Sequence, residues 1–146
     1  YSLCDGSRST QTKYCTNSAY GEVDDKAFLE RANDVASTVL GSKWRMPTNS
    51  DFNELIQECK WRTVRKNGCI CFKVTGPNGK SIYLPAAGFQ NGKDDCSVAY
   101  DGFYWSSSLY KYHYSQFADV LYFYSDNMIW NYFDRYYGQS VRGVIE

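Results

Sequence analysis

The sequence predicts an α+β fold in which two N-terminal helices are followed by antiparallel strands and long loops. Helical periodicity is confined to residues 23–59, whereas the chain beyond Trp61 consists of short aromatic or β-branched segments bounded by turn residues. Helices and strands that occur in separate runs are typical of α+β folds rather than of alternating α/β folds. Because 146 residues is the length of one ordinary domain, we expect residues 1–146 to form a single domain.

The first helix is expected within "VDDKAFLERANDVASTVLG", residues 23–41. Asp24 and Asp25 would lie at its N-terminus, where carboxylates are favourable, and Gly41 would close its C-terminus. The apolar side chains of this stretch recur at helical spacing: Phe28, Leu29, Ala32, Val35, Ala36 and Val39.

The second helix is expected within "PTNSDFNELIQEC", residues 47–59. Thr48 has the character of an N-cap, and Asp51 three residues later completes a variant of the capping box. The apolar side chains that follow keep a spacing of three and four residues: Phe52, Leu55, Ile56 and Cys59.

Strands are expected in the remainder of the chain. "CICFKVTGPNGKSIYLP", residues 69–85, predicts a hairpin around the Gly-Pro-Asn-Gly turn. Four further segments are short, rich in aromatic or β-branched residues and bounded by Gly, Ser, Asn or Asp: "GFYWSS", "FADVLYFY", "NMIWNYF" and "GQSVRGVI".

The charge balance excludes two classes of partner. Sixteen basic and sixteen acidic side chains cancel, so no overall positive charge favours nucleic acid or an anionic membrane surface. No apolar run approaches the roughly 20 residues that cross a bilayer, so membrane insertion is not expected. If the protein is exported, we expect that a leader has been removed.

The six cysteines are expected to form structural disulfides rather than a metal site: Cys4, Cys15, Cys59, Cys69, Cys71 and Cys96. Cys4 and Cys15 bracket a short polar loop and are the first candidate pair, while the other four allow three pairings. The single residue between Cys69 and Cys71 and the absence of a second histidine beside His113 disfavour zinc. No calcium-loop motif accompanies the Asp-Asp pairs, so no metal or other cofactor is expected.

Several motifs resemble, in order, those of the Fibrobacter-type major paralogous domain, which is familiar in exported proteins of gut Bacteroidetes: "WRMPTNSDFNELI", "KVTGPNGKSIYLPAAG", "YWSSS", "LYF" and "RYYGQSVRGV". The resemblance covers about residues 25–146 and leaves residues 1–24 as an N-terminal extension that contains Cys4 and Cys15. It implies a C-type lectin-like fold, related in architecture to formylglycine-generating enzymes and to the variable proteins of diversity-generating retroelements.

Ten of the fourteen tyrosines lie in the last 47 residues, which directs attention to residues 104–137 as a variable ligand-binding region. The family pattern "LYF" keeps Leu121 and Phe123, which implies that they face the core and that Tyr122 and Tyr124 face outward. The candidate ligand-binding residues are Tyr104, Tyr110, Tyr112, His113, Tyr114, Tyr122, Tyr124, Asp126, Asn127, Asn131, Tyr132, Asp134 and Tyr136.

A surface of Tyr, Ser, Asn and Asp has the composition of an antibody paratope, in which tyrosine supplies a large contact with few torsions to fix. We therefore expect a secreted or cell-surface recognition domain, with no catalytic residues, for an unknown protein or glycan, within a larger surface or pilus assembly.

One alternative is a non-diversified structural module of such an assembly. A second is a copper oxidase like the formylglycine-generating enzymes, which would need two accessible thiols. A hydrolase built on His113 with Asp119 or Ser115 lacks the Gly-x-Ser-x-Gly motif.

Overall fold

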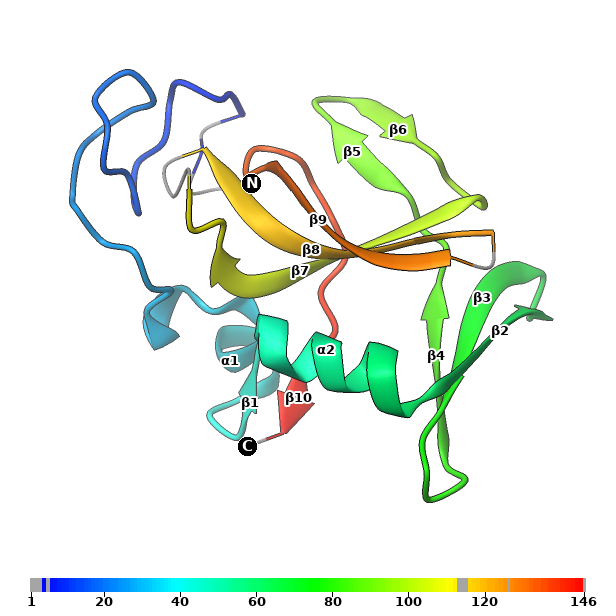
Figure 1. The fold of residues 1–146 in the computed structure, drawn as a ribbon. Coiled ribbons are helices and arrows are strands. Elements are labelled where there is room, and N and C mark those ends of the chain that lie inside the picture. Colours follow the sequence, from blue (N-terminus) through cyan, green and yellow to red (C-terminus); the bar gives the residue numbers. More distant parts are fainter. Residues whose placement is uncertain (1–3, 5, 113–115, 126, 146) are drawn as a thin grey trace.

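The computed structural model describes residues 4, 6–112, 116–125 and 127–145 and shows an α+β fold of mainly antiparallel sheets (Figure 1). In chain order, the elements are the 3-10 helix η1 (Arg31–Asn33), α1 (Val35–Leu40), β1 (Trp44–Arg45), α2 (Asn49–Glu58), β2 (Lys60–Lys66), β3 (Cys69–Thr75), β4 (Ser81–Pro85), β5 (Phe89–Asn91), β6 (Asp94–Cys96), β7 (Asp101–Leu109), β8 (Phe117–Tyr124), β9 (Asn127–Asp134) and β10 (Val144–Ile145).

Two three-stranded sheets, β7-β8-β9 and β2-β3-β4, form most of the structure. Figure 1 shows α2 running along one side of β7-β8-β9 and leading into β2-β3-β4 beyond its C-terminal end. The short pair β1-β10 ties the segment before α2 to the C-terminal segment, and β5-β6 forms a separate hairpin. The α+β class expected from the sequence is therefore confirmed.

Strand β8 is the centre of the core because side chains from both of its sides are buried. Val120 points to one side, Leu121 and Phe123 point to the other, and all three are fully inaccessible to solvent. Successive side chains of a strand point to opposite faces, so the sheet β7-β8-β9 must be covered twice. We call the side of Leu121 and Phe123 the α2 face and the side of Val120 the opposite face.

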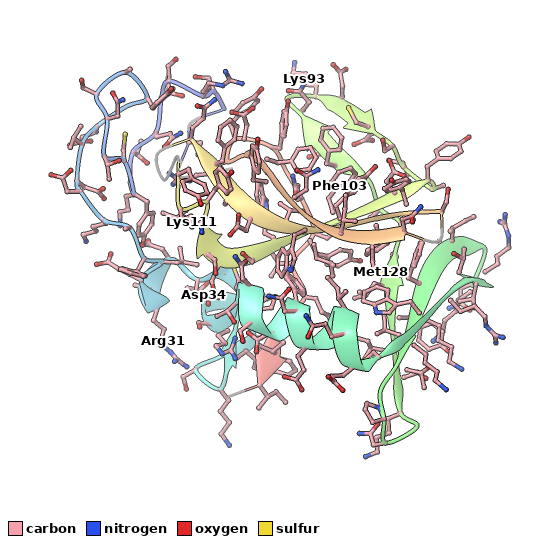
Figure 2. The ribbon with its side chains drawn as sticks, in the orientation of Figure 1. Arg31, Asp34, Lys93, Phe103, Lys111 and Met128 are labelled. Carbon is pink, nitrogen blue, oxygen red and sulfur yellow. The ribbon has the colours of Figure 1, made fainter. Side chains whose placement is uncertain are left out.

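The α2 face is covered by α2 and by the sheet β2-β3-β4. Phe52 of α2 and Phe72 and Leu84 of the second sheet pack with Leu121 and Phe123. The rings of Phe72 and Phe123 lie 4.4 Å apart between centroids. Met128 lies on this side of the sheet and Phe103 on the other (Figure 2).

The opposite face is covered by α1 and by the segments on either side of it. Ala36 of α1 and Met46 pack with Phe103, Trp105 and Val120. Several half-buried apolar side chains complete this second cluster: Leu29, Phe89, Leu109, Tyr122, Phe133, Tyr137 and Val141.

The described part of residues 4–24 is held against the domain by a buried arginine. Arg135 is 2% exposed, and its Nη1 donates to Gln11 Oε1 and to the carbonyl oxygen of Tyr14, both at 2.8 Å. Its Nη2 donates to the carbonyl oxygen of Lys13 at 2.9 Å. A buried guanidinium requires such acceptors, so this segment is part of the packed structure.

The second predicted helix and the predicted hairpin are confirmed. Thr48 caps α2, and the capping box with Asp51 is formed in both directions. β3 and β4 pair in antiparallel fashion around the Gly-Pro-Asn-Gly turn. The guanidinium of Arg45 also contacts both oxygens of Asp51, at 2.7 and 3.0 Å, and these hydrogen bonds hold the pKa of the Asp51 carboxyl well below its usual value.

The first predicted helix is wrong over its N-terminal half. Its regular part begins only at Val35, because Asp34 accepts hydrogen bonds from the amides of Ala36 and Ser37 and so caps α1. Asp24, which was expected to begin a helix, instead accepts from the amides of Tyr14 and Cys15 at 2.9 Å. The predicted C-terminal end of this helix is confirmed, since Gly41 closes α1 with a φ of 98°.

The predicted strands at residues 102–107, 117–124 and 127–133 correspond to β7, β8 and β9. Only Val144 and Ile145 of the segment 138–145 form a strand, while Gly138 and Ser140 make isolated bridges. The sequence did not predict β1, β2, β5 or β6. β2 was missed because four of its seven residues are basic, which gives it the composition of an exposed loop.

The expected disulfides are not present in the structure, which shows all six cysteines as free thiols. The Sγ–H of Cys15 donates a hydrogen bond to the carbonyl oxygen of Asn17 at 3.1 Å. Cys4 and Cys15 are both fully buried, and burial raises the pKa of the Cys4 thiol to about 11.

The capping box predicts a measurable contribution to stability. Replacing Asp51 by alanine should lower the free energy of unfolding by about 1–2 kcal/mol at neutral pH, because a helix cap and an ion pair are lost together. Because the pKa of Asp51 is lowered on folding, this contribution is complete above the ordinary carboxylate pKa of 3.8 and is lost as the pH falls below it. Urea unfolding across that pH range tests this.

Ser50→Ala is the control for that experiment, since Ser50 is exposed and lies in the same turn of α2. It should leave the free energy of unfolding within about 0.5 kcal/mol of the original. Equal losses from the two variants, or a loss from Asp51→Ala that does not change with pH, would contradict the assigned role.

The cysteines predict a simple thiol titration. Without reductant, the denatured protein should react as six thiols, and in the native protein the exposed Cys69 should react first. Buried thiols with raised pKa values react slowly, so Cys4 should react only on unfolding. A count short by two in the denatured protein would instead indicate a disulfide.

Candidate ligand-binding surface

An aromatic group that we call the Tyr110 cluster (Tyr110, Tyr112, Phe117 and Tyr132) lies at one end of the α2 face. The rings of Tyr110 and Tyr132 are stacked with centroids 4.1 Å apart, and Tyr112 meets Tyr110 edge-on at 5.5 Å. Phe117 supports Tyr132 from the side at 5.1 Å. Tyr112 is 67% exposed and Tyr132 is 43% exposed, so the cluster offers aromatic surface to solvent.

The cluster is positioned by a bulge in β7. The register between β7 and β8 shifts between Trp105 and Leu109, so the backbone there turns away from β8. The amide of Ser107 instead donates to the carbonyl oxygen of Pro47 at 2.8 Å. The bulge thus joins β7 to the residues just before α2 and leads the chain into Tyr110.

A polar network fixes the N-terminal end of α2 beneath the cluster. Ser106 Oγ donates to Asn49 Oδ1 at 3.0 Å, and the amide of Asn49 donates to Ser108 Oγ at 3.3 Å. Asn49 Nδ2 donates to the carboxylate of Asp119, which lies opposite Tyr132 in the sheet. The serines of the "YWSSS" motif therefore hold the framework together and do not themselves form the aromatic surface.

The surroundings of Tyr110 favour its neutral phenol. Desolvation raises the pKa of Tyr110, and burial raises the pKa of Asp119 despite its hydrogen bond from Asn49. The Lys111 ammonium lies 4.8 Å from the ring centroid of Tyr112. At neutral pH Tyr110 therefore keeps its hydroxyl hydrogen and can donate as well as accept hydrogen bonds.

A second group of predicted residues lies on the opposite face of the sheet. Tyr122 stacks on Phe103 at 4.7 Å and on Tyr124 at 5.1 Å. Tyr124 is 37% exposed, and Ile129, directly opposite Tyr122 in the sheet, is 42% exposed. Because Tyr122 and Tyr132 point to opposite sides, the predicted residues form two separate surfaces and not one.

Two asparagines belong with this second group. Asn127 is exposed and pairs with Tyr124 in the sheet. Asn131 lies opposite Val120, and its side-chain oxygen accepts a hydrogen bond from the amide of Tyr132 at 2.9 Å. Tyr136 is half-buried and packs against Tyr137 at 4.6 Å, apart from both surfaces.

Two predicted ligand-binding residues are buried, which corrects the prediction for both. Tyr104 is 4% exposed, its hydroxyl donates to the carbonyl oxygen of Pro85 at 2.9 Å, and burial raises its pKa to about 12. Asp134 is 7% exposed and its two oxygens accept from Nε and Nη2 of Arg8, each at 2.9 Å. Both side chains stabilise the fold. The predicted His113, Tyr114 and Asp126 lie outside the described residues.

Sequence reasoning missed the supporting members of the Tyr110 cluster. Phe117 and Asp119 were not among the predicted binding residues, and the pairing of β8 with β9 brings them beside Tyr132. Asn49 was expected only as part of a helix. No local pattern indicates that it would contact Asp119, which is 70 residues away in the chain.

The structure also has a cavity of about 430 Å³ between the η1–α1 segment and the opposite face. Buried Trp105 and Met46 line it, together with exposed Ala32 and Val35. None of the predicted ligand-binding residues that the structure describes lines this cavity. Among the described residues, Trp105 Nε1 and the side-chain amide of Gln139 are buried without a hydrogen-bond partner.

The described residues contain no group of three His, Cys, Asp or Glu side chains that could hold a metal ion. Cys71 is 4% exposed whereas Cys69 is exposed, so this pair does not present the two accessible thiols that a copper oxidase would need. No helix in the described ranges is long and apolar enough to cross a membrane.

Comparisons of the chain with protein-family models, with curated proteins and with solved structures found no match.

Tyr104 is buried and Tyr112 is exposed, so replacing each by alanine should have very different effects on stability. Tyr104→Ala should lower the free energy of unfolding by about 3–5 kcal/mol, because it empties a packed site and removes a buried hydrogen bond. Tyr112→Ala should change it by no more than about 0.5 kcal/mol, because the side chain is exposed. Urea unfolding measures both, and equal losses would contradict the assignment of Tyr104 to the core.

Proposed function

We propose that the chain is a non-enzymatic recognition domain that binds a protein or glycan through the Tyr110 cluster. The observation that carries this proposal is the stacked Tyr110–Tyr132 pair, with Tyr112 beside it, exposed at the end of a sheet. Exposed aromatic surface of this kind is costly to maintain in water and often marks a binding site.

Pre-organisation supports the proposal. Tyr132 comes from the regular strand β9, and Tyr110 follows the bulge that hydrogen bonds join to the start of α2. A ligand that meets these rings would immobilise few torsions, so little of the contact free energy would be lost to ordering. Tyrosine is also among the residues that contribute most to binding when they lie at the centre of an interface.

The architecture is consistent with a C-type lectin-like fold of the Fibrobacter-type major paralogous kind. Two helices precede the main strands, the pair β1-β10 brings the segment before α2 to the C-terminal segment, and a three-stranded sheet carries the aromatic residues. On the motif resemblance, the chain acts as the variable protein of a diversity-generating retroelement. It would then be exported, displayed at a cell surface or within a pilus or phage assembly.

A non-diversified structural module would have an invariant gene, whereas a variable protein would not. Sequencing the last 140 or so nucleotides of the gene in many cells of one population distinguishes the two. If the protein is variable, substitutions should arise at adenines and fall on codons of exposed residues. The exposed or half-exposed candidates among the described residues are Tyr110, Tyr112, Tyr122, Tyr124, Asn127, Asn131, Tyr132 and Tyr136.

Tyr104 and Asp134 are the internal controls for this experiment, because both are buried and should not vary. An invariant tail without a nearby template copy and reverse transcriptase would overturn the variable-protein proposal. Variation that falls equally on buried and exposed positions would contradict the assignment of the Tyr110 cluster as the selected surface.

A further inference from the structure

The basic side chains of this electrically neutral protein are unevenly distributed. Residues 60–85, which make up β2, β3 and β4, contain six of the sixteen basic side chains and none of the sixteen acidic ones. The rest of the chain therefore carries an acidic excess. The net charge of zero, which argued against an anionic partner, is therefore the sum of a positively charged sheet and an acidic remainder.

The register of the sheet places four of these cations on one side, which we call the cationic face (Lys60, Arg62, Lys66 and Lys73). Lys60, Arg62 and Lys66 alternate along β2, so they point in the same direction. Lys73 of β3 lies directly opposite Arg62. Figure 2 shows side chains ending in nitrogen projecting from the outer side of this sheet.

Buried Cys71 shares the side of these cations and the Lys66 ammonium lies over the ring of Tyr83, but most of the core lies on the other side of the sheet. Phe72, Val74 and Leu84 fill that side and are 1–2% exposed. Lys60, Arg62 and Lys66 are exposed, and within the described ranges no ion pair involves any residue of the cationic face. Ion pairing within the described residues therefore does not explain why these cations are gathered there.

We propose that the cationic face binds an acidic linear polysaccharide, one that carries carboxylates or sulfates at regular intervals along its chain. Side chains two residues apart on a strand are separated by roughly 7 Å, and those on neighbouring strands by about 5 Å, so the face presents rows of cations to an extended polyanion. Arg62 can bind a carboxylate or sulfate through two parallel hydrogen bonds, and the lysines act as point charges.

The aromatic residues of the sheet disfavour single-stranded nucleic acid, which is usually bound by exposed rings that stack on bases. Trp61 points into the core, where its Nε1 donates to the carbonyl oxygen of Leu55 at 3.0 Å. The ring of Tyr83 is covered by the Lys66 ammonium, 3.6 Å from its centroid. The large hydrophobic side chains that are exposed in the described residues lie outside β2-β3-β4, so no apolar wedge accompanies the charges for membrane binding.

Calorimetric titration with polygalacturonate, at low and at high salt, tests the proposal. The uncharged methyl ester of the same polymer is the matched ligand control. We expect binding of polygalacturonate that weakens as salt screens the charges, and no binding of the ester. Arg62→Gln combined with Lys66→Gln should weaken binding by about tenfold or more, because two charged contacts are lost.

Lys43→Gln combined with Arg142→Gln removes the same charge from exposed positions outside the sheet and should leave the affinity unchanged. A second pair on the cationic face, Lys60→Gln with Lys73→Gln, should reproduce the loss if the first pair does not fold. Equal losses in the face and control variants would overturn the proposal in favour of general charge attraction.

Three further results would overturn the proposal. The first is no binding of polygalacturonate at low salt. The second is tighter binding of a single-stranded RNA homopolymer under the same conditions, which would indicate a nucleic-acid surface. The third is tighter binding of vesicles that contain phosphatidylserine, which would indicate a lipid surface. Because no variant touches the Tyr110 cluster, these results are independent of the proposed recognition function.

Discussion

The burial of β8 on both sides is the constraint on which the rest of the structure depends. Val120 requires α1 and its neighbouring segments on one side, while Leu121 and Phe123 require α2 and a second sheet on the other. Each of these layers hides apolar surface that neither could bury alone. α1 accordingly packs in the cluster around Val120, and α2 packs in the cluster around Leu121 and Phe123.

The same constraint decides where aromatic side chains can remain available for binding. In the middle of the sheet both faces are occupied, so Tyr104 is drawn into the core and Tyr122 is partly covered by Phe103. The exposed tyrosines described in β8, in β9 and just after β7 lie toward the ends of the sheet, Tyr112 and Tyr132 at one end and Tyr124 at the other. The crowding of tyrosine and serine at residues 104–112 thus combines two tasks, since the serines attach the framework and the later tyrosines form the surface.

Local signals in the sequence predicted the parts of the fold that depend on local interactions. The capping box of Thr48 and Asp51 located α2, and the Gly-Pro-Asn-Gly turn located the β3–β4 hairpin. The first helix was predicted too long because its periodicity continues through Asp34, whose side chain is used as a cap and as an acceptor for the amide of Met46 at 2.8 Å. That second contact joins distant segments, which no periodicity in the sequence reveals.

The candidate site also combines features that local sequence patterns predict with features that depend on distant contacts. Alternation along β8 correctly separated Leu121 and Phe123 from Tyr122 and Tyr124, but it could not indicate that the other side was also covered. Nor could it reveal that Tyr132 and Tyr122 lie on different faces, because that depends on which residues of β9 pair with which residues of β8. The hydrogen bonds that hold Asp134 come from Arg8 of the N-terminal segment, which is 126 residues away in the chain.

The uneven distribution of charge also affects how copies of the protein interact with one another. A molecule with no net charge near its pI of about 6.8 is expected to lack long-range electrostatic repulsion. Here the positively charged sheet β2-β3-β4 is expected to attract the acidic parts of other copies when little salt is present. Added salt screens that attraction, and the protein should therefore become more soluble, not less, as the ionic strength rises from very low values.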